Sequence, residues 1–239
     1  MDYQTRCIIQ ALRRHEHIHP GGPRETADLY RCTGVRPMDR VLDVGCGFGG
    51  PAYWLREVAS ARVTGVDIVE ENCIRCRKAG VPPLSVVQGD ARQLPFREGS
   101  FDVVLSFCVL GQVDDKEAVL SEIRRVLRPG GSLGFDDYVV RDARRWRSGY
   151  PSNEHPYTEE DWIRSIQSVG FTLRNRQDLT ASFRRDYQAF LVDLQRRRTM
   201  VVDTFGEEAV ERAVGTFRAH VDAVLQGRKG GVRFVLARV

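Results

Sequence analysis

Short apolar stretches alternate with amphipathic helical patterns over the first 140 residues of the chain. Apolar runs predict five strands, at residues 40–44, 62–66, 84–88, 101–107 and 132–140. Helical periodicity between them predicts helices at residues 51–60, 69–79 and 115–127. Strands that alternate with helices in this way indicate right-handed crossovers and a parallel, doubly wound α/β sheet.

Two further regions flank this alternation. Residues 1–36 predict two short helices, broken at the turn His19-Pro-Gly-Gly-Pro23, where neither helix can continue. After the alternating region, the pattern predicts an irregular segment at residues 141–155, a helix at 158–169 and a strand at 171–179. A long helical region at 182–226, broken near Phe205-Gly206, and a closing strand at 231–239 follow. Because no crossover joins the last two strands, we expect an antiparallel edge. The patterns divide one domain into a helical arm, a core, and cap helices with closing strands, at residues 1–36, 37–140 and 141–239.

The composition is that of a globular domain. Of the 239 residues, 42% are hydrophobic and 28% are charged, and no apolar run approaches the roughly 20 residues that cross a bilayer. We therefore expect a cytoplasmic protein with no membrane partner. The six cysteines are spread along a chain that needs no disulfide framework. The lone Cys73-Ile-Arg-Cys76 lacks the second pair of a zinc site, so no metal is expected.

Basic residues concentrate in the last part of the chain. Residues 141–239 contain 18 Lys and Arg against 13 Asp and Glu, whereas residues 1–140 contain 18 against 19. A nucleic-acid-binding surface would carry such charge, but so would solvated helix faces. The second interpretation is favoured because no nucleic-acid-binding module accompanies the charge, and a nucleic-acid partner is not expected.

A glycine-rich loop follows the first predicted strand. Residues 41–50, VLDVGCGFGG, fit the dinucleotide fingerprint G-x-G-x-x-G and also D-x-G-x-G-x-G counted from Asp43. Both patterns present a helix start to an anionic group, and both expect a ribose-binding acid about twenty residues later, a place that Asp67 fills. Asp43 at the strand end suits a ligand with a cationic amine, and Asp90, after the third strand, suits an adenine amine. These two acids favour a methyl donor over a dinucleotide.

Five segments in register carry a family resemblance. DVGCGFG, VTGVD, GDARQLPF, FDVVLS and LRPGG together resemble the class I S-adenosylmethionine-dependent methyltransferases, closely so over residues 36–140. The N-terminal HPGG and the GGPAYWL segment are similar to the small-molecule branch, which includes ubiquinone/menaquinone and sarcosine/dimethylglycine methyltransferases. The resemblance implies a Rossmann-like, doubly wound seven-stranded sheet with an antiparallel last strand and a helical cap. It also implies S-adenosyl-L-methionine as cofactor and S-adenosyl-L-homocysteine as product.

The resemblance also implies which residues meet the cofactor. The methionine part would be lined by the residues of the glycine loop, Asp43, Gly45, Cys46, Gly47 and Gly49. Asp67 would bind both ribose hydroxyls, with Asn72 where relatives often have a ribose-binding glutamine. The adenine would lie beside Ile68, Asp90 and Ala91, and the methyl group beside Phe107 and Cys108. If the arm folds over the cofactor as in relatives, His19 would help to close the pocket.

A general base is needed only if the methyl acceptor must lose a proton. Candidates for catalysis are His155, Asp137 and Gln112, although Gln112 stands where many relatives have a histidine. Candidate substrate contacts are aromatic residues near and within the cap: Tyr138, Trp146, Tyr150 and Tyr187. His15, His17 and His19 alternate, and we expect an ordinary surface arm rather than a metal site there.

The sequence thus predicts a methyltransferase that acts at N, O or C of a small-molecule metabolite or natural product. Three alternatives stay open. Arsenite methylation, which resembling proteins perform through several thiolates, is disfavoured because the chain has no cysteine beyond Cys108. An RNA methyltransferase would exploit the basic C-terminal part. A methyltransferase fold can also bind the cofactor for other chemistry, such as cyclisation. The acceptor is left open, and so is the oligomeric state, with a homodimer among the options.

Overall fold

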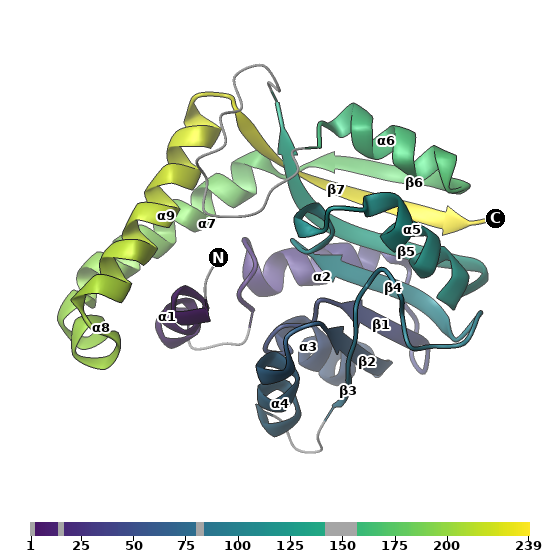
Figure 1. Ribbon diagram of the computed structural model, residues 1–239, viewed down its shortest axis with the longest axis horizontal. Helices are drawn as coiled ribbons and strands as arrows, with labels where there is room; N and C mark the ends of the chain where they lie inside the picture. The colour runs from purple at the N-terminus through teal and green to yellow at the C-terminus, as the bar shows by residue number, and fades with distance from the viewer. Residues whose placement is uncertain (1–2, 14–16, 80–83, 142–156) are drawn as a thin grey trace.

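A computed structural model describes residues 3–13, 17–79, 84–141 and 157–239. Its centre is a seven-stranded sheet in the order β3-β2-β1-β4-β5-β7-β6 (Figure 1). The strands are β1 Arg40–Val44, β2 Arg62–Asp67, β3 Ser85–Gln88, β4 Phe101–Phe107, β5 Leu127–Val140, β6 Phe171–Asp178 and β7 Lys229–Arg238.

Strand direction follows the sequence prediction. β1 to β5 pair in parallel, and β7 lies antiparallel between β5 and β6. The order reverses beside β1, so the carboxyl ends of β1 and β4 flank a crevice, which is where open α/β sheets bind ligands. The predicted Rossmann-like sheet with an antiparallel last strand is confirmed.

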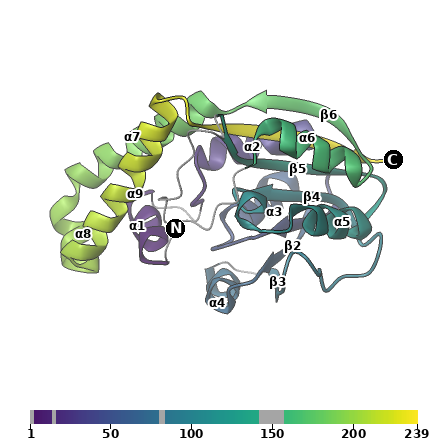
Figure 2. The same ribbon diagram turned by 45° about the horizontal axis from the view of Figure 1, so that its top comes forward.

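Helices cover both faces of the sheet (Figures 1 and 2). One face carries α2 Gly22–Thr33, α3 Gly50–Ala59 and α4 Glu70–Ala79, whose buried side chains form one apolar cluster with β1 and β2. The other face carries α5 Lys116–Val126 and α6 Glu159–Ser168, which pack Ile123 and Trp162 against β4, β5 and β7. These layers fix the strand ends that build the site.

A group of four helices lies beside the sheet: α1 Tyr3–Arg13, α7 Thr180–Arg196, α8 Arg198–Phe205 and α9 Glu207–Leu225 (Figure 1). Their apolar faces form a third buried cluster that reaches Cys108, directly after β4. The N-terminal helix therefore packs with the C-terminal cap, although they are far apart in sequence. The division into arm, core and cap stays a prediction.

The structure departs most from the sequence prediction at two places. β5 begins at Leu127 rather than 132, because Leu127 already pairs with Phe101 before the ladder shifts register. The long helical region breaks at Arg197 as well as at Gly206. The glycine at position 206 allows the φ of 84° that ends the helix there, so this break could be predicted from the sequence. The arginine at position 197 gives no such indication.

A buried ion network ties α2 to the sheet. The Arg233 guanidinium of β7 is fully buried and donates to the Asp136 carboxylate at 2.7 Å and to the Glu25 carboxylate at 2.9 Å. Burial raises the pKa of Asp136 to about 7 in spite of this cation. Elsewhere, no described helix is long and apolar enough to cross a membrane. All six cysteines are free thiols, and the described residues hold no cluster suited to a metal ion.

Candidate active site

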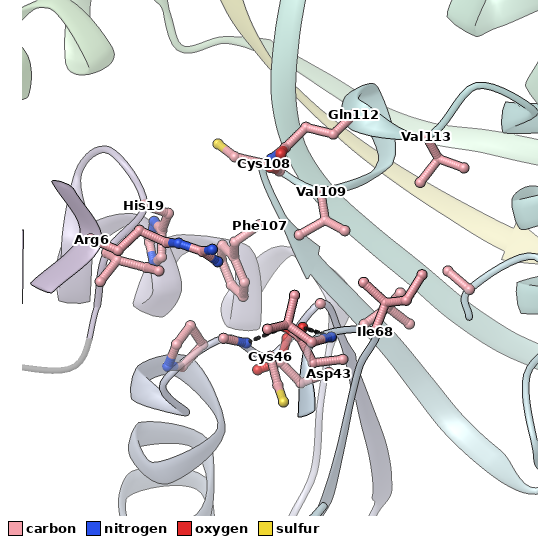
Figure 3. Close-up of a pocket in the computed structure, with 18 of the residues that line it drawn as sticks. Arg6, His19, Asp43, Cys46, Ile68, Phe107, Cys108, Val109, Gln112 and Val113 are labelled. Carbon is pink, nitrogen blue, oxygen red and sulfur yellow. Dashed lines mark hydrogen bonds between the residues drawn. The ribbon is translucent and has the colours of Figure 1, made fainter. Parts of the chain in front are cut away.

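One cavity of about 490 Å³ lies where the carboxyl ends of β1, β2 and β4 meet the arm and the cap (Figure 3). Asp43, Asp67 and Phe107 line it from the strand ends. Arg6 and His19 line it from the N-terminal side, and α7 and α9 close its far wall. This position fits the general rule for ligand sites in doubly wound sheets.

The loop after β1 brings backbone close to the cavity. The Gly45 and Cys46 amides donate to the Val66 carbonyl at 2.8 and 3.1 Å, which turns the chain sharply at the strand end. Gly45 has a φ of 73°, and a Cβ there would stand 2.3 Å from the Val109 side chain. The loop therefore requires glycine both for its conformation and for space.

Asp67 is held in place at the end of β2. Its Oδ2 accepts from the Gly47 amide at 2.9 Å, and its Oδ1 accepts from the Val69 amide at 2.9 Å and from Asn72 Nδ2 at 3.1 Å. The carboxylate lines the cavity, whereas Asn72 is 1% exposed and lies behind it. Asn72 thus orients Asp67, and the geometry gives it no place in the cavity wall.

Asp43 is a buried carboxylate with an incomplete hydrogen-bond set. It is 1% exposed and lines the cavity, and its Oδ2 has no partner among the described residues. Burial, and then the nearby Asp67 charge, raise the pKa of Asp43 to about 7. A cation in the cavity would supply both the missing donor and the missing charge.

Arg6 contributes the opposite charge, which sequence reasoning missed. It extends from α1 into the cavity beside His19 and Phe107 (Figure 3), and its buried Nε has no acceptor among the described residues. Asp43 also lines the cavity, so the site combines a cation whose Nε lacks an acceptor with a carboxylate oxygen that lacks a donor among the described residues. That pair matches the carboxylate and ammonium of an amino acid, which is the methionine part of S-adenosylmethionine.

The adenine end of the predicted site is open. Ile68, Asp90 and Ala91 all line the cavity, and Ile68 is 60% exposed. The Asp90 carboxylate accepts from the Arg92 amide and guanidinium, and these hydrogen bonds lower its pKa. An apolar side chain beside an ionised acceptor suits a flat heterocycle with an exocyclic amine, so the described residues fit the cofactor along its whole length.

Two histidines of the arm are buried, and the expectation of an ordinary surface arm was wrong for them. His17 and His19 are each 5% exposed, because both rings bond the Thr26 hydroxyl of α2 at 3.0 Å. The His19 ring also stacks on Phe107, with 4.5 Å between centroids. The arm thereby covers the cavity at the end of β4, while His15 lies outside the described residues.

Two candidate catalytic residues, Asp137 and Gln112, hold the loop after β4. Asp137 is 1% exposed, accepts from the Gly111 amide at 2.7 Å and from the Tyr138 amide at 2.8 Å, and is not among the described lining residues. Gln112 lines the cavity, but its amide donates to the Cys108 carbonyl. Gly49 caps α3 and packs on Cys76, outside the cavity wall.

The cap wall is aromatic. Tyr138 and Tyr187 line the cavity, as expected for substrate contacts, and Phe217 and His220 of α9 join them. His220 was missed because a lone histidine on an amphipathic helix gives no signal until the helices pack. Cys46, Gly45, Gly47, Phe107 and Cys108 also line the cavity. His155, Trp146 and Tyr150 lie outside the described residues.

The fold and this cavity together define the class of protein: a class I S-adenosylmethionine-dependent methyltransferase fold with its cofactor site at the β1–β4 crevice. Residues 42–135 match the family model of the methyltransferase domain. These residues, the core of the sheet, belong to the methyltransferase-domain family, whose cofactor is S-adenosylmethionine.

Individual relatives agree with this assignment. Sterol 24-C-methyltransferase ERG6B of Gibberella zeae is 33% identical over 189 residues, which are 72% of this chain and 47% of that protein. The chain thus spans about half the length of the curated relatives it matches.

Two solved structures share the fold at lower identity. Phosphoethanolamine N-methyltransferase 2 of Haemonchus contortus, solved with phosphomonomethylethanolamine and S-adenosylhomocysteine, has a TM-score of 0.89 at 19% identity and covers 99% of this chain and 57% of its own. The 4+2 cyclase SpnF has a TM-score of 0.82 at 20% identity, with 99% and 94% covered.

Proposed function

We propose that this protein transfers the methyl group of S-adenosylmethionine to a carbon atom of a largely apolar small molecule. The observation that carries the proposal is the buried Oδ2 atom of Asp43, which has no partner among the described residues. Arg6 lines the same cavity. Methylation at carbon is supported by the similarity to a sterol 24-C-methyltransferase. The aromatic cap wall supports an apolar acceptor.

The residues divide the work of binding between the two ends of the cofactor. Asp43 and Arg6 hold the ammonium and carboxylate of its methionine part, and Asp67 binds the ribose hydroxyls. Ile68, Asp90 and Ala91 bind the adenine. When bound, the cofactor supplies an electrophilic methyl group on a sulfonium.

The remaining residues orient the methyl acceptor and exclude water. Phe107 and Cys108 flank the reacting end, and the His19 ring over Phe107 closes that side of the cavity. Holding the two reactants in line supplies roughly 7–11 kcal/mol of the barrier reduction. Tyr138 and Tyr187 face the acceptor, and Trp146, Tyr150 and His155 stay candidates for its contacts. We propose that the protein resides in a reducing compartment, because all six of its cysteines are free thiols.

The direct test is a mass-spectrometric screen of acceptors. Purified protein is incubated with S-adenosylmethionine and sterols, terpenoids, phenols or bulk RNA. The proposal expects a gain of one methyl in an apolar small molecule, in step with S-adenosylhomocysteine release. Asp67→Asn is the matched control and should abolish both signals.

Two outcomes would overturn the proposal. Methylation of RNA alone would assign the enzyme to another substrate class. Tight cofactor binding with no S-adenosylhomocysteine release for any acceptor would favour chemistry without methyl transfer, such as cyclisation.

A further inference from the structure

The turn His19-Pro-Gly-Gly22 places one histidine ring in the cavity wall. Gly21 and Gly22 have φ values of 80° and 52°, and the Gly22 amide donates to the His19 carbonyl at 3.3 Å, which closes the turn. The His19 ring lines the cavity and stacks on Phe107, with 22° between the ring planes (Figure 3). The turn therefore brings a titratable ring to the end of β4.

The Pro20 carbonyl determines the tautomer of His19. His19 Nδ1 lies 3.0 Å from this oxygen, which can only accept, so the ring carries a proton on Nδ1. In the neutral ring Nε2 is then an acceptor, and the Thr26 hydroxyl lies 3.0 Å from it. Because both ring nitrogens are bonded to protein atoms, the ring meets the cavity through its carbon atoms.

The hydrogen bonds around His19 also fit its protonated form. The Thr26 hydroxyl has one proton, and its oxygen lies 3.2 Å from the Gly22 carbonyl as well as 3.0 Å from His19 Nε2. When Nε2 gains a proton it becomes the donor to Thr26, and the Thr26 proton turns to the Gly22 carbonyl. One hydroxyl rotates and each partner stays bonded, so protonation changes the charge of the ring without moving it.

His17 shares the Thr26 hydroxyl but not the cavity. His17 Nδ1 lies 3.0 Å from Thr26 Oγ1 and 3.4 Å from His19 Nε2. Two cationic rings at this separation would repel each other, so the pair accepts one proton at a time. Both rings are equally buried, but His17 is not among the described residues that line the cavity. It is therefore a matched comparison for His19.

The charged groups around this turn fall into two sets. One set is paired within the protein: Arg13, which donates to the His19 carbonyl, with Asp186, and Glu25 with Arg233. The other set lines the cavity, where a bound cofactor meets it: Arg6, Asp43 and Asp67. The Cys108 thiol after β4 stays protonated, because burial raises its pKa. Since Asp186 and Glu25 already neutralise arginines, a proton on His19 would add positive charge to the cavity wall.

Resting on the proposed methyltransferase function, we propose that His19 determines how strongly the site distinguishes S-adenosylmethionine from S-adenosylhomocysteine. The two molecules differ only by a methyl group and the positive charge on sulfur, and the proposed function places that sulfur beside Phe107. A neutral aromatic pair attracts a cation through its rings, whereas a protonated ring repels it. The neutral form of His19 therefore favours the methyl donor, and the protonated form favours the product.

Thr26 is the positioning residue of this arrangement. It lies on α2, is fully buried and holds the His19 ring over Phe107. Without its hydroxyl, a protonated Nε2 would lose this acceptor inside the protein, so the charged form of His19 would become costly. Thr26→Val should therefore keep His19 neutral to lower pH, and Thr26→Ser should restore the wild-type behaviour.

The test is the ratio of two dissociation constants, that of S-adenosylmethionine divided by that of S-adenosylhomocysteine. Calorimetry measures both between pH 5 and pH 8, with no acceptor present. Toward pH 5, we expect the wild-type ratio to rise at least about fivefold more than the ratio of His19→Phe, because a charge on the ring then repels the sulfonium. The phenylalanine ring can still stack on Phe107 but cannot gain a proton.

The same comparison separates His19 from Asp43, which titrates in this pH range. Asp43 meets the ammonium group that both ligands share, so most of its effect cancels in the ratio. Any remaining effect persists in His19→Phe, which retains Asp43. The difference between the two pH profiles therefore belongs to His19.

His17→Gln is the matched control and should keep the wild-type rise. Binding of S-adenosylhomocysteine at pH 8 shows that each variant is folded, and if His19→Phe fails this check, Thr26→Val against Thr26→Ser makes the comparison. Equal profiles for the wild-type protein and His19→Phe would overturn the proposal, as would a His17→Gln profile as flat as that of His19→Phe. Failure of the wild-type protein to bind either ligand would instead contradict the proposed function, so the two failures are distinguishable.

Discussion

Asp43 is costly to the protein until a ligand arrives. Its carboxylate is buried, and burial together with the Asp67 charge raises its pKa to about 7, which disfavours the ionised form. A cationic ammonium within reach reverses that preference, so the pKa falls on binding. At this scale, one side chain couples the protonation of the protein to cofactor affinity.

The first prediction concerns Asp43→Asn. We expect S-adenosylhomocysteine to bind at least about 30-fold more weakly at pH 8, because a buried charge pair worth roughly 2 kcal/mol or more is lost. Binding of 5′-methylthioadenosine, which lacks the amino-acid part, should hardly change. Asp67→Asn should weaken both ligands, and equal losses for both ligands in Asp43→Asn would contradict its assigned role. Isothermal titration calorimetry makes the measurement.

The pH dependence follows from the same group. Below about pH 7, Asp43 is protonated in the free protein and must lose its proton to bind the ammonium, so wild-type affinity should fall with decreasing pH. Asp43→Asn should flatten this profile. Because the folded pKa exceeds the unfolded one, Asp43 stabilises the fold at low pH and loses that contribution as the pH rises through 7. The variant should therefore melt higher than wild type at pH 8, by a margin that shrinks toward pH 5.

Residue roles were predictable where a strand end fixes them. Asp43 and Asp67 follow short apolar strands, so their place at the sheet edge could be read from the sequence. Asn72 and Gln112 could not be assigned in this way, since their hydrogen bonds to Asp67 and to the Cys108 carbonyl depend on local packing. Arg6 was missed because a helix in the arm gives no indication of which side chain enters the cavity.

At the scale of elements, the arm is fixed to the sheet by charge as well as by apolar contact. Arg233 of β7 bridges Asp136 of β5 and Glu25 of α2, and Glu25 also accepts from Ser182 of α7. Losing the cation would leave two buried carboxylates facing each other. The arm carries Arg6 and His19 into the cavity, so this network also positions the site.

A further prediction concerns the effect of Arg233→Met on stability. We expect a loss of about 3–5 kcal/mol in the free energy of unfolding, because uncompensated buried charges remain. Arg176→Met breaks the ion pair between Arg176 on the edge strand β6 and Glu159 of α6, and it should cost under about 1 kcal/mol. Urea unfolding followed by circular dichroism compares them. If Arg233→Met costs no more than Arg176→Met, the network does not anchor the arm.

Element boundaries were predicted closely because caps and glycines mark them. Thr158 caps α6 with a full capping box, and Gly206 separates α8 from α9. The break at Arg197 was missed, since it lies within a run of arginines of high helix propensity. The antiparallel pairing of β7 followed from the lack of a crossover, but its place between β5 and β6 became known only from the structure.

For the whole molecule, the cavity is a meeting point of distant segments. The arm supplies Arg6 and His19, the core supplies Asp43, Asp67 and Phe107, and the cap supplies Tyr187 and His220. Core motifs repeat throughout the family, so the cofactor half was predictable. The acceptor half was not, because it arises where α7 and α9 pack on β5 and β7.

The central claim is that the loop after β1 binds S-adenosylmethionine rather than a dinucleotide. Isothermal titration calorimetry of the wild-type protein with S-adenosylmethionine and, separately, with NAD tests it most directly. We predict saturable one-to-one binding of S-adenosylmethionine and no detectable heat from NAD. Binding of NAD without binding of S-adenosylmethionine would contradict the account.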